Sequence, residues 1–292
     1  MTNTLDQQVD YPVEANRYHL LAAYPCPFAH RAMIVRELMG LDDAVSIGIA
    51  NSIKYEQYWG FKDAIGSVDD KDAVLGISNL SEPYLKGDPD YTGPYSVPAL
   101  VDTHSGTVVN SESLDIIRDF ATRFKTIAKA DAPDLYPAGE EKEIEEWFSY
   151  VGTKVLGPGI RATHSKKQGV YDVAYEMIFS ALDALEEHFA THEFLMGDHL
   201  TLADVVMYTP LARFDVVFYP VGSLNKKHLY EYPNLWRYTR QLYQMPAFKH
   251  TTHFKEIQKG FYLGKSSEVI YSREVLPAGP DLSRWEEPVS GQ

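Results

Sequence analysis

Two hydrophobic periodicities alternate along the first part of the chain. The run RYHLLAAY at 17–24 is short and apolar and stops at prolines, which predicts a buried strand. The next segment, PFAHRAMIVRELMG at 27–40, has apolar residues at every third or fourth position, which predicts a helix. Pro27 suits the first turn of this helix and Gly40 suits its end. The run AVSIGIA at 44–50 predicts a second strand.

Residues 51–94 interrupt this alternation, since they are irregular and rich in Gly, Asp and Tyr. A connection of this length is unusual inside a compact domain, so we interpret it as a functional insertion. After it, YSVPALVD at 95–102 and TVVN at 107–110 flank THSG, which predicts a hairpin. The apolar spacing at 111–124 then predicts another helix.

Strand signals largely stop after a Pro-rich linker at 129–140, and the rest of the chain shows helical spacing. We therefore predict a small α/β domain at 1–126, which carries the insertion, and an all-helical domain at 140–276. The segment 277–292, which contains Pro and Gly, predicts an extended tail. The clearest helical patterns lie at 141–157, 171–190, 200–220 and 232–246.

The composition narrows the classes of partner. Among 292 residues, 41 Asp and Glu outnumber 27 Lys and Arg, for a formal net charge of −14. Nucleic acids and anionic membranes attract positively charged surfaces, so neither is an expected partner. No apolar run reaches the roughly 18 residues of a membrane span, and the first residues lack the basic and apolar regions of a secretory signal. We therefore expect a cytoplasmic protein.

The single cysteine, Cys26 in YPCPFAHR, is the first candidate for chemistry. It cannot form a disulfide within this chain, so any thiol cycle needs a second sulfur from another molecule. Its place just before Pro27 resembles a helix N-cap, where unpaired backbone amides and the helix dipole stabilise a thiolate. His30 and Arg31, one turn further on, are candidates for additional positive charge. The alternative is a small buried cysteine without reactivity.

Two further features accompany this cysteine. Pro98 stands at the start of a predicted strand, where an ordinary trans edge proline is one reading. Alternatively, the position of Pro98 is similar to that of the cis proline in thioredoxin-like folds, which faces the active-site cysteine. In those folds the backbone of the residue before the proline, here Val97, pairs with a peptide thiol. Glu112 and Ser113 fall at the start of a predicted helix. They are either capping residues or contacts for the charged amino-acid end of a peptide thiol.

Together CPFAH, SVPAL and SES, in this order and followed by a helical domain, resemble the cytosolic glutathione transferases. In GDHLTLADVVMYTPLARFD at 197–215, Thr201 and Asp204 fit a capping box with Asp in place of the usual Glu or Gln, which is a structural role. Transferases of this superfamily carry such a motif in the core helix of their C-terminal domain. The resemblance implies a thioredoxin-like α/β domain, an all-α C-terminal domain and a homodimer.

A finer resemblance is to the glutathionyl-hydroquinone reductases, or Xi-class transferases. It is carried by CPFAHR, by the aromatic insertion with YLKGDPDYTG at 84–93, by RFD at 213–215 and by YQMP at 243–246. The family has a catalytic cysteine, residues that bind the thiol substrate and a tyrosine that reaches the acceptor pocket. The resemblance implies Cys26 as the nucleophile, Trp59, Val97, Glu112 and Ser113 as thiol-binding residues, Pro98 as a structural residue and Tyr262 as the acceptor-pocket tyrosine.

The implied activity is the removal of a thiol adduct from a hydroquinone by thiol–disulfide exchange. The co-substrate would be glutathione or a related low-molecular-weight thiol, and no metal is implied, since the histidines lack ligand spacing such as H-E-x-x-H. Two alternatives stay open. One is a general thiol transferase that reduces dehydroascorbate or mixed disulfides, and the other is a non-catalytic, transferase-like binding protein.

The chain departs from the family at three positions. Pro94 stands where an arginine is common, so one cationic contact to a glutathione carboxylate is missing. Ile160 replaces an expected substrate-binding tyrosine, and Phe218 replaces another, although Tyr219 follows it. These departures leave the native thiol and the physiological acceptor open.

Overall fold

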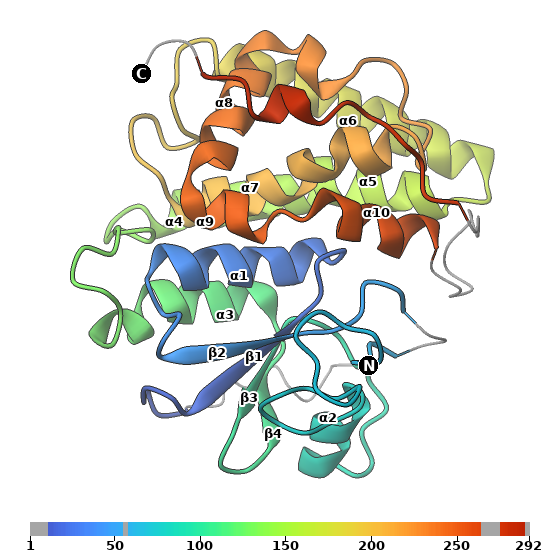
Figure 1. Ribbon diagram of the computed structural model, residues 1–292. Helices are drawn as coiled ribbons and strands as arrows, with labels where there is room; N and C mark the ends of the chain where they lie inside the picture. Colours follow the sequence, from blue (N-terminus) through green and yellow to red (C-terminus); the bar gives the residue numbers. More distant parts are fainter. Residues whose placement is uncertain (1–10, 55–57, 264–274, 290–292) are drawn as a thin grey trace. The chain divides into compact units, whose positions relative to one another are not determined.

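The computed structural model describes residues 11–54, 58–263 and 275–289. The chain divides into two compact units, 1–133 and 134–292, and their boundary lies inside the Pro-rich segment 129–140. Figure 1 shows strands in the first unit and helices in the second.

The first unit is built on a four-stranded sheet with the strand order β2-β1-β3-β4. Strand β1 pairs in parallel with β2 and antiparallel with β3, and β3 pairs antiparallel with β4. A parallel pair needs a crossover connection, and helix α1 (Pro27–Leu38) supplies it. The strands are β1 (Tyr18–Ala22), β2 (Val45–Ile49), β3 (Ala99–Asp102) and β4 (Thr107–Asn110).

One face of this sheet is covered by α1 and α3 (Ser113–Ala121), which pack against each other (Figure 1). The helix that the sequence predicts at 111–124 begins at Ser113 in the structure and ends at Ala121. A 3-10 turn follows it at Arg123–Thr126.

The insertion at 51–94 is not irregular throughout, because it contains the short helix α2 (Ser81–Gly87). Before this helix, the Glu82 carboxylate accepts the backbone N–H groups of Ser78 and Asn79. Leu80 and Tyr84 are buried at its start. Seven residues make only two turns, too few for a helical period to show in the sequence, so tertiary burial decides this element.

A buried polar contact joins the insertion to the sheet. His19 of β1 lies 2.7 Å from the Ser46 hydroxyl through Nδ1 and 3.1 Å from an Asp72 carboxylate oxygen through Nε2. Asp72 also accepts the backbone N–H groups of Val74 and Leu75. Burial alone would raise the pKa of Asp72, but hydrogen bonding and charge from His19, together with these backbone donors, lower it.

The space around this contact is tight. A Cβ atom at Gly48 in β2 would overlap the Asp72 carboxylate and lie 2.6 Å from the His19 Nε2 atom. The backbone of β2 therefore approaches the polar contact as closely as a glycine allows. Because the contact reaches from β1 and β2 into the insertion, it fixes part of residues 51–94 on the sheet.

The second unit contains seven α-helices within its described residues. Two of them continue into π-helical stretches, Val151–Leu156 after α4 and Phe214–Phe218 after α7. None of the helices in the described ranges is long and apolar enough to cross a membrane. The helices are α4 (Glu141–Tyr150), α5 (Gly157–His164), α6 (Gln168–His188), α7 (Leu202–Arg213), α8 (Pro233–Gln244), α9 (Pro246–Thr251) and α10 (Phe254–Tyr262).

Helix α7 is the core helix of this unit, since all its residues are buried, and it begins at a capping box. The Thr201 hydroxyl accepts the Ala203 N–H at 3.3 Å, and the Asp204 carboxylate accepts the Thr201 N–H at 2.9 Å. Asp204 also accepts the Leu195 N–H and the Tyr238 hydroxyl, each at 2.9 Å. One carboxylate thus caps α7 and contacts both α8 and the loop before α7.

The tail is not extended throughout its described part. Residues Ser283–Trp285 form a 3-10 turn, and Trp285 is buried. Its ring lies 4.9 Å from that of Trp236, 5.2 Å from Tyr243 and 4.9 Å from Phe254, measured between centroids. A single aromatic anchor therefore packs the tail on α8 and α10, which the Pro and Gly content of the segment did not indicate. Residues 264–274 and 290–292 of the predicted helical domain and tail lie outside the described residues.

The capping carboxylate should make stability depend on pH. Burial raises the pKa of Asp204 from 3.8 to about 6, although its hydrogen bonds oppose this. Because the folded-state pKa lies above the ordinary value, the stabilisation is complete below about pH 4 and is lost as the pH rises through about 6. A difference of about two pKa units corresponds to about 3 kcal/mol.

We expect Asp204→Asn to remove this part of the pH dependence, since an amide does not titrate. Urea unfolding of both proteins at several pH values between 4 and 7 measures it. Free energies of unfolding that follow parallel curves in the wild type and the variant would contradict the assignment.

Candidate thiol site

Cys26 lies where the chain leaves β1 and enters α1. Its backbone is extended, with φ −76° and ψ 117°, and it is the N-cap residue of α1, with Pro27 at the first helical position. The Cys26 N–H donates to the Ala23 carbonyl and its carbonyl accepts the His30 N–H, each at 3.1 Å. A turn followed by a proline therefore places a half-buried thiol at a helix start.

The thiol does not use the helix amides in the way expected from the sequence. The Cys26 side chain makes no capping hydrogen bond. Instead its S–H donates to the Val97 carbonyl at 3.3 Å. Val97 is buried, and the Val97–Pro98 peptide bond is cis. The structure thus places the predicted nucleophile beside the predicted backbone site, at the beginning of β3.

A buried cation lies on the same helix. Arg31 of α1 is 3 % exposed, and its Nη1 atom lies 3.5 Å from the Ser113 hydroxyl oxygen. Its guanidinium carbon lies 5.1 Å from the centroid of the Phe28 ring. Burial lowers the pKa of Arg31 to about 10, and the charge of Cys26 raises it. The Nε atom is buried and has no hydrogen-bond partner within the described part of the chain.

Glu112 and Ser113 meet at the start of α3. Glu112 is the N-cap residue and is exposed, and its N–H donates to the Asn110 side chain at 2.9 Å. Ser113 is the first helical residue and is buried. The contact between Arg31 and Ser113 connects this helix start to α1, the helix that has Cys26 as its N-cap residue.

Trp59 lies in the insertion and is half-buried. Its carbonyl accepts the Leu80 N–H at 3.0 Å, and the Lys54 ammonium lies 5.8 Å from the ring centroid. Trp59 and Cys26 both pack against the same cluster of buried residues in the first unit. The structure therefore places Trp59 on the core that also supports the thiol.

A group of tyrosines was missed as a unit by the sequence analysis, although the aromatic content of the insertion was its signal. Tyr84 donates its hydroxyl hydrogen to the Ser96 carbonyl at 2.9 Å, one residue before Val97. Tyr91 donates to the Pro94 carbonyl at 3.1 Å. These contacts hold the segment that leads into the cis peptide bond. Neighbouring rings in the group are 5.1–5.7 Å apart between centroids, and its members are Tyr58, Tyr84, Tyr91 and Tyr95.

The site residues expected in the second unit lie on its helices. Tyr262 is the last residue of α10 and is 7 % exposed. Ile160 lies in α5 and is half-buried, whereas Phe218 is fully buried. Gly159 leaves room for the Phe218 ring, since a Cβ atom at this position would lie 2.7 Å from the ring. The ring of Tyr219, the next residue, stacks on the ring of His228, with 3.7 Å between the two centroids.

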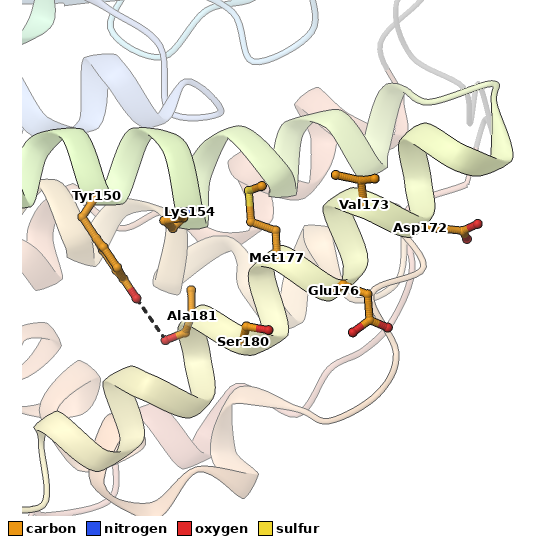
Figure 2. A pocket seen from close by; sticks show the side chains of 8 residues that line it. All are labelled: Tyr150, Lys154, Asp172, Val173, Glu176, Met177, Ser180 and Ala181. Atoms are coloured by element: carbon orange, nitrogen blue, oxygen red, sulfur yellow. Dashed lines mark hydrogen bonds between the residues drawn. The ribbon is translucent and has the colours of Figure 1, made fainter.

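A separate hollow of about 640 Å³ lies on the second unit (Figure 2). The Tyr150 hydroxyl donates to the Ala181 carbonyl at 3.5 Å on its wall. None of the predicted site residues lines it. Within the ranges that the structure describes, no group of three or more His, Cys, Asp or Glu side chains could hold a metal ion. The lining residues are Tyr150, Lys154, Asp172, Val173, Glu176, Met177, Ser180 and Ala181.

Comparison with known proteins identifies the family. The glutathione S-transferase N-terminal domain matches residues 25–123, and the glutathione S-transferase C-terminal domain matches residues 168–241. The glutathionyl-hydroquinone reductase YqjG of Escherichia coli K12 is 33% identical over 267 residues, which cover 91% of this chain and 80% of YqjG.

Solved structures give the same result. A glutathione transferase from Gordonia bronchialis superimposes with a TM-score of 0.91 at 38% identity, over 96% of this chain and 86% of its own. A Xi-class transferase from Natrialba magadii gives 0.89 at 34% identity, over 98% and 86%. Glutathione-bound YqjG gives 0.88 at 33% identity, over 95% and 89%.

These matches confirm the predicted fold class, a thioredoxin-like α/β domain followed by an all-α domain. They extend over most of this chain and most of each relative, so they are not limited to a shared domain. This chain therefore belongs to the glutathione transferase superfamily and, within it, to the Xi class of glutathionyl-hydroquinone reductases.

Proposed function

We propose that this protein is a glutathionyl-hydroquinone reductase with Cys26 as its nucleophile. One observation carries the proposal: the single sulfur lies at the start of α1, beside the Val97 carbonyl that precedes a cis proline. The relative YqjG, a glutathionyl-hydroquinone reductase by name, has been solved with glutathione bound. The proposed activity follows from this geometry together with membership of the family.

The first step is attack by the Cys26 thiolate on the sulfur of a glutathionyl-hydroquinone. An S–S bond forms between the enzyme and glutathione, and the bond between sulfur and the ring carbon breaks. The electron pair moves to that ring carbon, which takes up a proton and becomes the hydroquinone. A phenol can deliver this proton, and we assign that role to Tyr262.

The second step regenerates the enzyme. A second glutathione thiolate attacks the sulfur of the enzyme-bound glutathione, so that glutathione disulfide forms and Cys26 leaves as a thiolate. Over the cycle the ring carbon exchanges its bond to sulfur for a bond to hydrogen, and the sulfur of the conjugate and the sulfur of one free glutathione become one disulfide. This cycle explains how a chain with one cysteine can act as a reductase, since glutathione contributes both other sulfurs.

The remaining site residues position the thiol substrate. We assign backbone pairing with its cysteinyl part to Val97, and contacts with its charged γ-glutamyl end to Glu112 and Ser113 at the start of α3. We assign Trp59, which lies in the insertion, as a further residue that binds the thiol substrate. Pro98, Thr201 and Asp204 are structural in this proposal. A homodimer, which the superfamily suggests, is also proposed, and sedimentation at micromolar concentration tests it.

Replacement of the nucleophile should abolish turnover. We expect Cys26→Ser to reduce the turnover of glutathionyl-menadiol to the uncatalysed background, because a serine hydroxyl is not ionised near neutral pH. Ser180→Ala, in the hollow of Figure 2, is the matched control and should retain activity. Full activity of Cys26→Ser would refute the proposed mechanism.

The same assay separates the alternatives. A wild-type protein that reduces hydroxyethyl disulfide but not the hydroquinone conjugate is a general thiol transferase, a reading favoured by Ile160 in place of a substrate-binding tyrosine. A protein that turns over neither compound is a binding protein of this family. In both cases the proposed reductase activity fails.

The thiol itself can be tested at Pro94. This residue is exposed and stands where the family commonly has arginine, and its contact with Tyr91 uses only its carbonyl. We expect Pro94→Arg to lower the KM for glutathione by up to about fivefold, the worth of an exposed ion pair, with kcat unchanged. Pro94→Gln controls for the loss of the proline. Equal KM values in both variants would indicate that no glutathione carboxylate lies nearby.

A further inference from the structure

Trp59, which is assigned to bind the thiol substrate, lies in a short two-stranded ribbon of the insertion. The Trp59 ribbon consists of residues 59–61 and 78–80. An antiparallel bridge and backbone hydrogen bonds of 2.9 and 3.0 Å join its two strands. A pair of strands this short is at most marginally stable by itself in water, so contacts with the rest of the first unit must hold it.

Apolar burial supplies part of this support. Phe61 and Leu80 of the ribbon are buried and belong to a cluster of apolar residues in the first unit. Trp59 and Cys26 pack against the same cluster. Apolar burial is not directional, so it retains the ribbon on the core without fixing where the indole ring of Trp59 lies.

A directional contact reaches the ribbon from the sheet. The turn at 72–77 leads directly into the second strand of the ribbon, and its first N–H donates to its last carbonyl at 2.9 Å. One carboxylate oxygen of Asp72 accepts two further N–H groups of this turn, at 2.7 and 3.0 Å. The other oxygen lies 3.1 Å from the Nε2 atom of His19 in β1. Asp72 therefore closes the turn and also joins it to the sheet.

His19 is itself held in place. It is buried, and its Nδ1 atom lies 2.7 Å from the hydroxyl of Ser46, its register partner in β2. The backbone of β2 confines the contact further, since a Cβ atom at Gly48 would overlap the Asp72 carboxylate. Breaking a buried polar contact costs free energy because the separated groups lose their partners. His19 and Asp72 therefore set where the turn, and the ribbon that follows it, lies on the sheet.

A second aspartate of the first unit has a similar set of contacts outside the insertion. Asp102 of β3 accepts the His104 N–H through one oxygen at 2.9 Å, and Arg17 through the other at 2.8 Å. It is 6 % exposed, close to the 4 % of Asp72. Loss of the side-chain donor would leave a buried carboxylate in both cases, but only Asp72 lies in the segment that leads to Trp59. The contact between Arg17 and Asp102 is therefore a matched control.

We propose that His19 and Asp72 are positioning residues for the thiol substrate, because their contact fixes the ribbon that carries Trp59. The proposal rests on the proposed function, in which Trp59 binds that substrate. His19 and Asp72 are buried, so they act through the ribbon and do not touch the thiol themselves.

Positioning of this kind affects binding rather than the reacting sulfur. The Cys26 S–H contacts the Val97 carbonyl, and this contact involves neither His19 nor Asp72. A displaced Trp59 weakens binding in the ground state and in the transition state alike. Loss of the contact should therefore raise the KM for glutathionyl-menadiol and leave kcat unchanged.

The experiment compares three variants of the contact with the wild type. His19→Leu removes the contacts with Ser46 and Asp72. Gly48→Ala forces the two groups apart by the overlap of the added Cβ atom and leaves both in the chain, so it keeps the test decisive if His19→Leu does not fold. His19→Gln is the conservative variant, since its amide keeps an N–H donor for Asp72. Arg17→Met is the matched control.

Two measurements are made on each folded protein. Hydrogen exchange with mass spectrometry reports the amides of the Trp59 ribbon, and calorimetric titration gives the Kd for glutathione. In His19→Leu and Gly48→Ala we expect the ribbon amides to exchange about tenfold faster, since a buried polar contact is lost. We expect the Kd to rise about two- to tenfold, the worth of one aromatic contact. His19→Gln should remain close to the wild type, and Arg17→Met should change neither quantity.

The outcomes decide the proposal. Faster exchange of the ribbon together with weaker glutathione binding in His19→Leu or Gly48→Ala, but not in Arg17→Met, supports it. Unchanged exchange overturns it, and so does faster exchange with an unchanged Kd. An equal effect of Arg17→Met also overturns it, since this would reflect a general disturbance of the first unit.

The two proposals fail in different ways. Hydrogen exchange and glutathione binding need no hydroquinone and no turnover. If the wild type binds glutathione but does not turn over glutathionyl-menadiol, and Gly48→Ala weakens binding, the proposed function alone is refuted. Normal turnover by the wild type together with an unchanged Kd in Gly48→Ala refutes the positioning role alone. A wild type that does not bind glutathione refutes both.

Discussion

The single thiol of this chain depends on the backbone around it, and the contact that holds it joins the start of α1 to the residue just before β3. The Cys26 S–H donates to the Val97 carbonyl at 3.3 Å, and Arg31 of the same helix is buried with its Nη1 atom 3.5 Å from the Ser113 hydroxyl. Unpaired buried cations are costly, and neutral buried thiols are poor nucleophiles. The thiol and the guanidinium therefore both depend on contacts that the fold of the first unit supplies.

The rest of the first unit supports the contact between Cys26 and Val97 by holding the backbone opposite the sulfur. The Val97 carbonyl accepts the thiol hydrogen, and Tyr84 holds the residue before Val97 through the Ser96 carbonyl. The insertion that carries Tyr84 is fixed on the sheet by the contact between His19 and Asp72. The insertion thus positions one wall of the thiol site from elements that are far from Cys26 in sequence.

Local signals were predicted well, because they depend on neighbouring residues. Pro27 after Cys26 indicated the start of α1, and Thr201 with Asp204 indicated the start of α7, where the structure has a capping box. Short helices were missed. Helices α2 and α9 have seven and six residues, too few for a periodic pattern, and they are decided by what they pack against. Trp285 in the tail is buried for the same reason.

By itself, the sequence determined the order of the strands and of several longer helices, the family and the place of Cys26 at a helix start, since each follows from short-range pattern. Tertiary structure alone decided which groups from distant parts of the chain contact that sulfur and its helix. The Val97 carbonyl is 71 positions from Cys26 in the chain, and Ser113 is 82 positions from Arg31. Whether an arginine on a helix is solvated or buried depends on contacts across such separations, which no local pattern records.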